Sequence, residues 1–218
     1  MKRLFLLLLL TSFYGIAQQQ YVIEKDIHYY SDSLDKKDIY RDSQCTLDIY
    51  YPKNANNFAT VVWFHGGGLT SGNKEIPTAL LEKGFAVIGV GYRFSPKVKA
   101  PVYIEDAAAA IAWAFQHIGK YGGNTDLIFL SGHSAGGYLT MMVGLDKKYL
   151  SKYSIDANKI AGNIPFSGHT ITHFTVRKEK GMNDIQPLID EYAPLFFARP
   201  DASPLVLITG DPELELLG

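Results

Sequence analysis

The chain has 218 residues, of which 47% are hydrophobic and 20% charged, with a formal net charge of -1 and one cysteine. The length predicts one globular domain with a sizeable core, and the 14 Tyr and 12 Phe exclude intrinsic disorder because they supply ample apolar surface. The near-neutral charge argues against a protein that binds the phosphates of nucleic acid, and the single Cys45 excludes an internal disulfide or a cysteine-based metal cluster.

Residues 1–17 have the pattern of a secretory signal peptide. A basic start is followed by an apolar run from Leu4 to Leu10, with small residues before Gln18. The run is shorter than the ~20 apolar residues that a transmembrane helix needs, so we expect cleavage rather than a membrane anchor. We therefore expect residues 18–218 to form the exported domain, periplasmic or extracellular, where a chain with one thiol is little exposed to oxidation.

After a polar, tyrosine-rich entry, apolar runs alternate with helical patterns. Residues 59–64 (ATVVWF) form a β-branched and aromatic run that ends in glycines, which is typical of a strand buried on both faces. Apolar residues at three- and four-residue spacing predict one long amphipathic helix over 104–118. In chain order we expect strand 45–51, strand 59–64, helix 76–83, strand 85–90, helix 104–118, strand 127–130, helix 135–145, and strands 160–166 and 205–209.

This alternation of strands and helices predicts an α/β fold with a mostly parallel sheet and helices on both faces. Ligands of such sheets collect at the carboxyl ends of the strands, so the chemistry is expected just after each strand.

The segment Gly132-His133-Ser134-Ala135-Gly136 lies between strand 127–130 and helix 135–145. A serine on so sharp a turn is forced into strained backbone geometry, and small neighbours leave its oxygen uncovered. The helix N-terminus behind it offers unpaired N–H groups to a developing oxyanion. The pattern therefore predicts Ser134 as a nucleophile.

The segment His65-Gly66-Gly67-Gly68 follows strand 59–64 directly. Consecutive glycines let the backbone approach a substrate closely and turn its N–H groups inward. We expect Gly67 and Gly68 to form an oxyanion hole together with the N–H of Ala135. A phosphate-binding loop is disfavoured, because neither Gly-Lys-Ser/Thr nor Gly-x-Gly-x-x-Gly is present.

The run VVWFHGGGLTSGNKE, the triplet Gly91-Tyr92-Arg93, the helix IEDAAAAIAWAF and the turn SGHSAGGYLT together resemble the α/β-hydrolase superfamily. The similarity is greatest to its carboxylesterase branch, with hormone-sensitive-lipase-like and bacterial feruloyl- and acetyl-esterase-like (BD-FAE) enzymes, and covers roughly Asp48 to Gly218. The resemblance implies an eight-stranded, mostly parallel sheet and a catalytic triad in the chain order serine, acid, histidine. It also implies that His65 orients the oxyanion loop.

The same resemblance places the acid of the triad after strand 205–209, at Glu213 or at Asp211. Either carboxylate could hold an imidazole in one tautomer. The base histidine is implied beyond Gly218, so we expect this chain to lack the C-terminal helix, the last strand and the base of a larger hydrolase. His169 and His173 are internal alternatives, although they are better suited to line the pocket or cap a turn.

These features predict an exported serine carboxylic-ester hydrolase that forms an acyl-enzyme at Ser134 and needs no cofactor or metal. The expected substrate is a small-molecule or carbohydrate-linked ester, and we expect no nucleic-acid partner and no membrane after signal cleavage. Two alternatives remain: a serine peptidase of the prolyl-oligopeptidase type, which shares the turn around Ser134, and a non-catalytic binding protein on a hydrolase scaffold, which the missing histidine favours. The oligomeric state is left open.

Three further expectations concern the surroundings of the site. Asp106 is expected to make a structural contact at a helix start, and Tyr92 and Arg93 to hold the end of the sheet together. Residues 170–204 either cap the pocket or form an ordinary surface connection with one helix.

Overall fold

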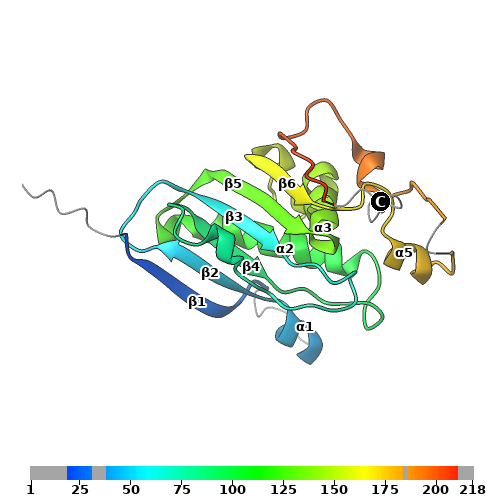
Figure 1. Cartoon of the computed structure of the whole chain (residues 1–218), viewed down its shortest axis with the longest axis horizontal. Coiled ribbons are helices and arrows are strands. Elements are labelled where there is room, and N and C mark those ends of the chain that lie inside the picture. Colours follow the sequence, from blue (N-terminus) through cyan, green and yellow to red (C-terminus); the bar gives the residue numbers. More distant parts are fainter. Residues whose placement is uncertain (1–18, 31–37, 184–185, 211–218) are drawn as a thin grey trace, which may run out of the picture.

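The computed structural model describes residues 19–30, 38–183 and 186–210, and Figure 1 shows their arrangement. Six strands form one sheet in the order β1-β2-β4-β3-β5-β6. Strand β2 is antiparallel to its neighbours β1 and β4, whereas β4, β3, β5 and β6 are parallel to one another. This confirms the mostly parallel α/β sheet. The strands are β1 (Tyr21–His28), β2 (Thr46–Pro52), β3 (Phe58–Phe64), β4 (Ala86–Val90), β5 (Gly123–His133) and β6 (Gly162–Phe166).

The helices of the described residues include two long ones that pack side by side on the sheet, α2 and α3. The expected helix 104–118 is therefore confirmed, and so is the expected helix 135–145. The α-helices are α1 (Ile39–Gln44), α2 (Val102–His117), α3 (Ala135–Leu145), α4 (Lys148–Ser151) and α5 (Phe174–Glu179), with short 3-10 helices η1 (Thr78–Leu80), η2 (Ile118–Tyr121), η3 (Ala157–Lys159) and η4 (Pro194–Phe197). None of these helices is long and apolar enough to cross a membrane.

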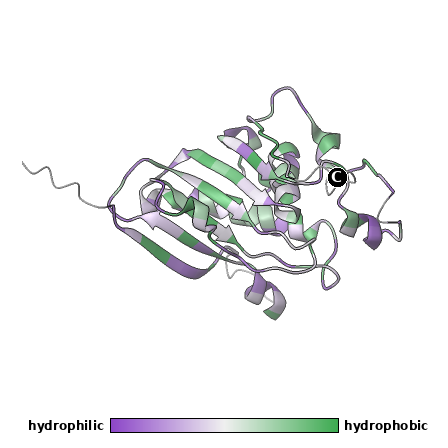
Figure 2. Cartoon of the chain, in the orientation of Figure 1, coloured by the Kyte–Doolittle hydropathy of each residue, from purple (hydrophilic) through white to green (hydrophobic). Residues whose placement is uncertain are grey.

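Helix α2 is the centre of the core rather than an amphipathic surface helix. Tyr103, Ile104 and every residue from Asp106 to Ala114 are buried. The run of alanines explains this, because side chains of one methyl group let the sheet and α3 approach several faces of the helix closely. Figure 2 shows the corresponding hydrophobic colour along α2 and the central strands, and a more hydrophilic β1 at the edge.

The predicted helix 76–83 is wrong, since only the single 3-10 turn η1 forms there. Pro77 precedes this turn, Leu81 after it is extended with ψ of 144°, and Glu82 has φ of +57°. The backbone instead runs close over the sheet: a Cβ at Gly89 in β4 would lie 2.2 Å from the carbonyl oxygen of Glu75. Such a contact leaves no space for a helix at this point.

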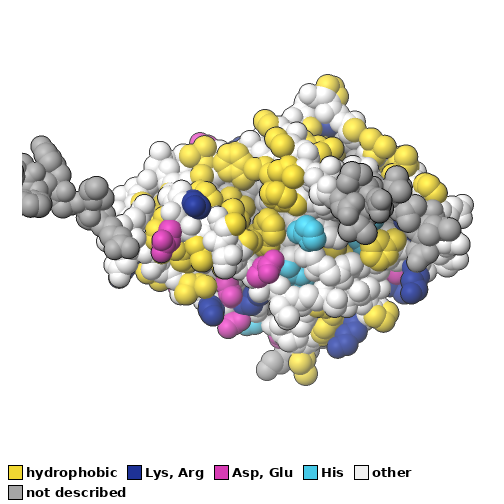
Figure 3. All heavy atoms as spheres, viewed as in Figure 1, with side chains coloured by type: hydrophobic (Ala, Val, Ile, Leu, Met, Phe, Trp, Pro, Cys, Tyr) yellow, Lys and Arg dark blue, Asp and Glu magenta, His cyan; other side chains and the backbone are white. Residues whose placement is uncertain are grey.

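Without a helix at 76–83, β3 is less buried than its sequence predicts. Ala59 and Val61 are only half-buried, so β3 is not buried on both faces along its length. Figure 3 shows hydrophobic side chains gathered on the face of the sheet turned to the viewer, over β3, β5 and β6.

The predicted strand 205–209 lies where expected, beside β6. Parallel bridges join Asn163 to Leu205 and Phe166 to Ile208, and the Ser167 N–H donates to the Ile208 carbonyl over 2.7 Å. The bridges are isolated, however, so these residues do not form a continuous strand. Residues 205–208 remain 37–56% exposed, because among the described residues they lie at the sheet edge.

Candidate active site

The turn between β5 and α3 has the strained geometry that its sequence predicts. Ser134 adopts φ of +53° and ψ of -114°, which a residue with a side chain rarely does. Two hydrogen bonds hold it: the Ser134 N–H donates to the Phe166 carbonyl over 2.8 Å, and its carbonyl accepts the Tyr138 N–H over 3.0 Å. The backbone of β6 and the first turn of α3 thus fix the position of Ser134.

Close backbone packing also requires the glycines beside Ser134. A Cβ at Gly136 would lie 1.9 Å from the Phe64 carbonyl oxygen, and one at Gly132 would lie 2.6 Å from the same atom. The turn therefore packs its backbone directly against the end of β3. This close packing excludes larger residues at both positions.

The loop after β3 lies against this turn. A Cβ at Gly66 would be only 3.6 Å from Cβ of Ser134. Gly67 and Gly68 have φ of +117° and +63°, and the Gly67 carbonyl accepts the N–H groups of Thr70 and Ser71. Among the described residues, no acceptor receives the N–H of Gly67, Gly68 or Ala135. The sequence-predicted donors are therefore uncommitted, on a loop that touches the serine.

His65 packs inside the base of this loop. Its ring stacks on Tyr92 with centroids 4.4 Å apart, its Nδ1 lies 2.6 Å from the Gly66 carbonyl oxygen, and the Tyr92 hydroxyl donates to the His65 carbonyl. Burial lowers the pKa of His65, so the ring is neutral at pH 7 and can donate its Nδ1–H to Gly66. These contacts agree with the role in orienting the loop that the resemblance implies.

Helix α5 covers the other side of the same loop, which sequence patterns did not predict. A Cβ at Gly68 would lie 3.1 Å from Cζ of Phe174, and the Thr175 hydroxyl donates to the Gly68 carbonyl. Residues 107 positions apart meet here, so no local pattern could have indicated the contact. The described part of 170–204 accordingly packs against the candidate site through α5.

Of His169 and His173, the two internal alternatives for the base, His173 caps α5. Its Nδ1 accepts the Thr175 N–H over 3.2 Å, and its side chain is fully buried. Burial lowers the pKa of His173 well below the ordinary value of 6.5. The ring of His169 lies 4.7 Å from that of His173, edge to face. The interpretation of His173 as a capping residue is confirmed.

Asp211 and Glu213, the two candidates for the acid, lie outside the described residues. The chain that leads to them is hydrogen-bonded to the end of β6, whose Phe166 carbonyl also accepts the Ser134 N–H. A Cβ at Gly210 would lie 3.6 Å from the Ser167 hydroxyl oxygen. The last described residue is thus at the same end of the sheet as Ser134.

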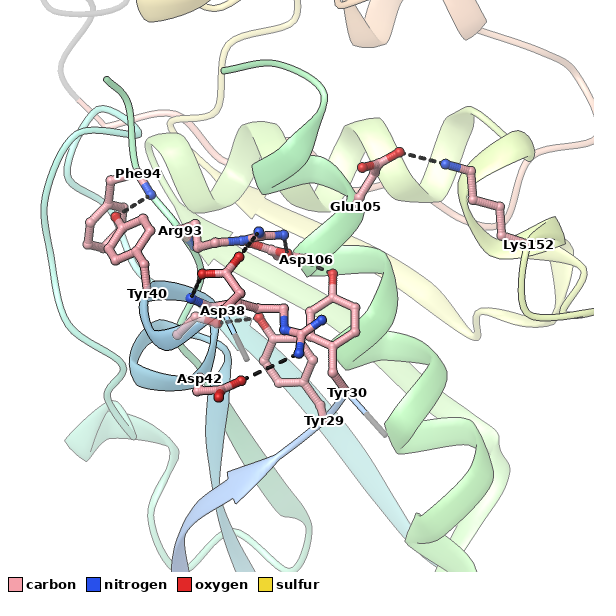
Figure 4. Close-up of polar contacts among 12 residues, drawn as sticks. Tyr29, Tyr30, Asp38, Tyr40, Asp42, Arg93, Phe94, Glu105, Asp106 and Lys152 are labelled. Atoms are coloured by element: carbon pink, nitrogen blue, oxygen red, sulfur yellow. Dashed lines mark hydrogen bonds and ion pairs between the residues drawn. The ribbon is translucent and has the colours of Figure 1, made fainter. Parts of the chain in front are cut away.

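Beside the site, Arg93 and Asp106 form a buried ion pair that confirms the structural role expected of both (Figure 4). Asp106 is fully buried and accepts hydrogen bonds from the Arg93 backbone N–H, from its Nε and Nη2, and from the Tyr30 hydroxyl. Burial opposes the charge of Arg93, but the bonds to Asp106 raise its pKa above the ordinary value. The polar N-terminal segment contributes through Tyr30 and Asp38, which the sequence did not indicate.

Comparison with known proteins adds three findings. The BD-FAE family model matches residues 47–217. The Mycobacterium tuberculosis (strain H37Rv) proteins named "Probable carboxylic ester hydrolase LipM" and "Esterase LipC" are 33% identical over 111 residues and 28% identical over 136 residues. These matches cover 47% and 60% of this chain but only 26% and 32% of the relatives, so the chain spans about a quarter to a third of their length.

Among solved structures, a "truncated form of carbohydrate esterase from gut microbiota" has a TM-score of 0.69 and 21% identity, covering 89% of this chain and 78% of that one. Esterase B from Lactobacillus rhamnosis has a TM-score of 0.66 and 19% identity, covering 87% of this chain and 65% of that one. At such low identity these two structures establish the fold alone.

Proposed function

The chain belongs to the BD-FAE family of α/β-hydrolase carboxylesterases, and from this premise we propose that it hydrolyses carboxylic esters through an acyl-enzyme at Ser134. One observation carries the proposal: the strained turn that holds Ser134 lies in contact with a glycine loop whose N–H groups have no acceptor in the described part of the chain. The names of the curated relatives, which are esterases or ester hydrolases, support the same reaction.

In the proposed reaction, Oγ of Ser134 attacks the ester carbonyl carbon and a tetrahedral intermediate forms. Its oxyanion accepts hydrogen bonds from the N–H groups of Gly67, Gly68 and Ala135. The carbon–oxygen bond to the alcohol then breaks, and the alcohol leaves with a proton. Water attacks the acyl-enzyme, the acid is released and the Ser134 hydroxyl is restored. One oxyanion donor of this kind typically contributes about 2.7–4 kcal/mol to transition-state stabilisation.

The proton transfers require a histidine that takes the Ser134 proton and later gives it to the alcohol, with a carboxylate that holds the imidazole in one tautomer. We assign the carboxylate to Glu213 or Asp211 and the histidine to a position beyond Gly218, as the resemblance implies. Sequencing the transcript downstream of the Gly218 codon tests the second assignment: an in-frame histidine is expected there, and a stop codon at once would contradict it. Neutral variants Glu213→Gln and Asp211→Asn separate the two acids, because only the true partner of the histidine should lower kcat strongly when neutralised.

The nucleophile is tested on the protein expressed with the residues that the transcript encodes after Gly218, by labelling it with a fluorophosphonate probe and by assaying it on p-nitrophenyl acetate. Ser134→Ala should abolish both labelling and turnover, whereas Ser151→Ala, on the exposed side of α4, should change neither. Ester hydrolysis that survives Ser134→Ala would contradict the acyl-enzyme. Cleavage of a prolyl-peptide substrate but not of the ester would favour a peptidase instead.

We also propose that the protein is exported and acts on small-molecule or carbohydrate-linked esters. Amino-terminal sequencing of the secreted protein should begin at Gln18, and retention of the intact N-terminus in the cell would refute export. Release of acetate from acetylated xylo-oligosaccharides tests the substrate class, with p-nitrophenyl acetate as the reference ester.

A further inference from the structure

A cavity of about 530 Å³ lies next to the glycine loop, between that loop, the segment after β4, and α5. Its volume is within the range of small-molecule sites. Its lining consists of Thr70, Ser95, Pro96, Lys99, Phe174, Thr175, Lys178 and Glu179. We refer to it as the loop-side cavity.

The loop-side cavity is joined to the candidate site by short contacts. Thr70 donates its N–H to the Gly67 carbonyl, and Thr175 donates its hydroxyl to the Gly68 carbonyl. The ring of Phe174 approaches Gly68, where a Cβ would lie 3.1 Å from it, and also lines the cavity. The cavity therefore adjoins the glycine loop on the side that α5 covers.

Two lysines without an ion pair among the described residues line this cavity, and with Glu179 they give its lining a net charge of +1. Lys99 and Lys178 make no ion pair with any residue that the structure describes, whereas nearby Lys180 is paired with Asp190. Glu179 is the one acidic side chain in the lining, and its Oε2 accepts the N–H of Ala100 and the hydroxyl of Tyr103. Figure 3 shows Lys and Arg side chains, in dark blue, at the end of the molecule where Figure 1 places α5.

The remaining lining is amphipathic. Phe174 and Pro96 supply apolar surface, and Ser95 supplies a buried hydroxyl. Such a surface suits a ring or short carbon chain that bears polar groups, and the two lysines add a preference for negative charge.

We propose that the loop-side cavity binds a carboxylate group of the ester substrate through Lys99 and Lys178. The inference rests on the proposed ester hydrolysis at Ser134 and adds a preference for acidic esters. The carboxylate can belong to the alcohol half, as in an esterified uronic-acid sugar, or to the acyl half, as in the monoester of a dicarboxylic acid.

Binding is measured first, because it does not depend on turnover. Trigalacturonate and succinate are titrated into the Ser134→Ala protein by calorimetry at 20 mM and 500 mM NaCl. Exposed ion pairs change affinity by about 1.5- to 5-fold each, so Lys99→Gln/Lys178→Gln should weaken binding of one of these anions about 2- to 25-fold at low salt. The difference should shrink at high salt, and binding of neutral maltotriose should not change.

The matched control is Lys120→Gln/Lys159→Gln, which removes the same charge from exposed positions outside the cavity lining. Equal weakening by both double variants would show a general charge effect and overturn the proposal. Absence of binding by both anions would overturn it as well.

Kinetics with the protein that retains Ser134 then locates the carboxylate. A rise in KM confined to acetylated trigalacturonate places it on the alcohol half, and one confined to mono-4-nitrophenyl succinate places it on the acyl half. With p-nitrophenyl acetate, KM should stay constant. If no ester is hydrolysed but the anions bind through the two lysines, the proposed function fails while the anion site stands.

Discussion

Replacing Asp106 by asparagine should destabilise the fold far more than any neighbouring change of charge on α2. Asp106 is fully buried, whereas the side chain of its partner Arg93 is 14% exposed. The carboxylate accepts four hydrogen bonds at 2.6–3.1 Å, three from Arg93 and one from Tyr30 (Figure 4). Asparagine keeps the shape but presents an NH2 group to these donors and leaves the guanidinium without its counter-charge.

The expected cost is about 3–5 kcal/mol, the range for breaking a buried ion pair by removing one partner. Glu105, the preceding residue, provides the matched control because it pairs with Lys152 at the surface, where the two side chains are 35% and 54% exposed. Glu105→Gln should cost about 0–1 kcal/mol. Tyr30→Phe removes one hydrogen bond to the carboxylate and should be intermediate, at about 1.5–3 kcal/mol.

Urea unfolding at pH 7, followed by the fluorescence of Trp63 on β3 and Trp113 on α2, measures all three variants. The order Asp106→Asn, Tyr30→Phe, Glu105→Gln is the expected ranking of lost unfolding free energy. If Asp106→Asn yields no folded protein, Tyr30→Phe still tests the network. An Asp106→Asn cost within about 1 kcal/mol of Glu105→Gln would refute the argument that burial gives this pair its importance.

Three further predictions concern the candidate site. Gly136→Ala should prevent folding or lower the melting temperature sharply, since its Cβ would lie 1.9 Å from the Phe64 carbonyl oxygen. Gly119→Ala is the control and should be neutral or stabilising, because a Cβ there would have nothing within 4 Å. Equal melting temperatures of the two variants would contradict this prediction. Burial lowers the pKa of His173 below 6.5, so the folded protein favours the neutral ring. The free energy of unfolding that this preference supplies is fully present above pH 6.5. It is lost as the pH falls towards the folded-state pKa, by at most about 1.4 kcal/mol per pH unit. Urea unfolding between pH 6.5 and 5 should therefore give a shallower pH slope for His173→Gln, and an unchanged slope would reject the assignment. Thr175→Val removes the hydroxyl that donates a hydrogen bond to the Gly68 carbonyl. The kcat on p-nitrophenyl acetate should therefore fall up to about tenfold with KM unchanged. A change in KM alone would argue against a role of Thr175 in positioning the glycine loop.

Sequence patterns predicted best where one local property decides the structure. Helix 135–145 was placed correctly because β5 and the glycine turn before it define its start, and strand 85–90 because its apolar run is short and continuous. Ser134 could be identified for the same reason, since its turn needs small residues at fixed positions. The close packing of Gly136 against Phe64 of β3 could not be predicted from the motif, because β3 lies far away in the sequence.

The failures occurred where tertiary contacts override local preference. Residues 76–83 look helical in isolation, but the backbone before them lies against Gly89 of β4 and the chain turns at Glu82 with positive φ. Asp106 could be recognised as structural, yet its partners Tyr30 and Arg93 come from two separate segments, and Arg93 also contacts Asp38. No pattern in a single sequence reports such convergence.

The residues of the proposed reaction lie on local motifs, whereas those of the proposed specificity come together only through tertiary contacts. Ser134, Gly67 and Gly68 lie on two short motifs whose backbones touch, so the reaction could be inferred from local sequence. The loop-side cavity joins Lys99 to Lys178 across two distant segments, and it is linked to the glycine loop through α5, Thr70 and the Ser95 N–H, which donates to the Leu69 carbonyl. Substitutions at these lysines can therefore alter the preferred ester while the motif backbones stay in place, which is why a shift of KM without a shift of kcat is the result that would separate the two roles.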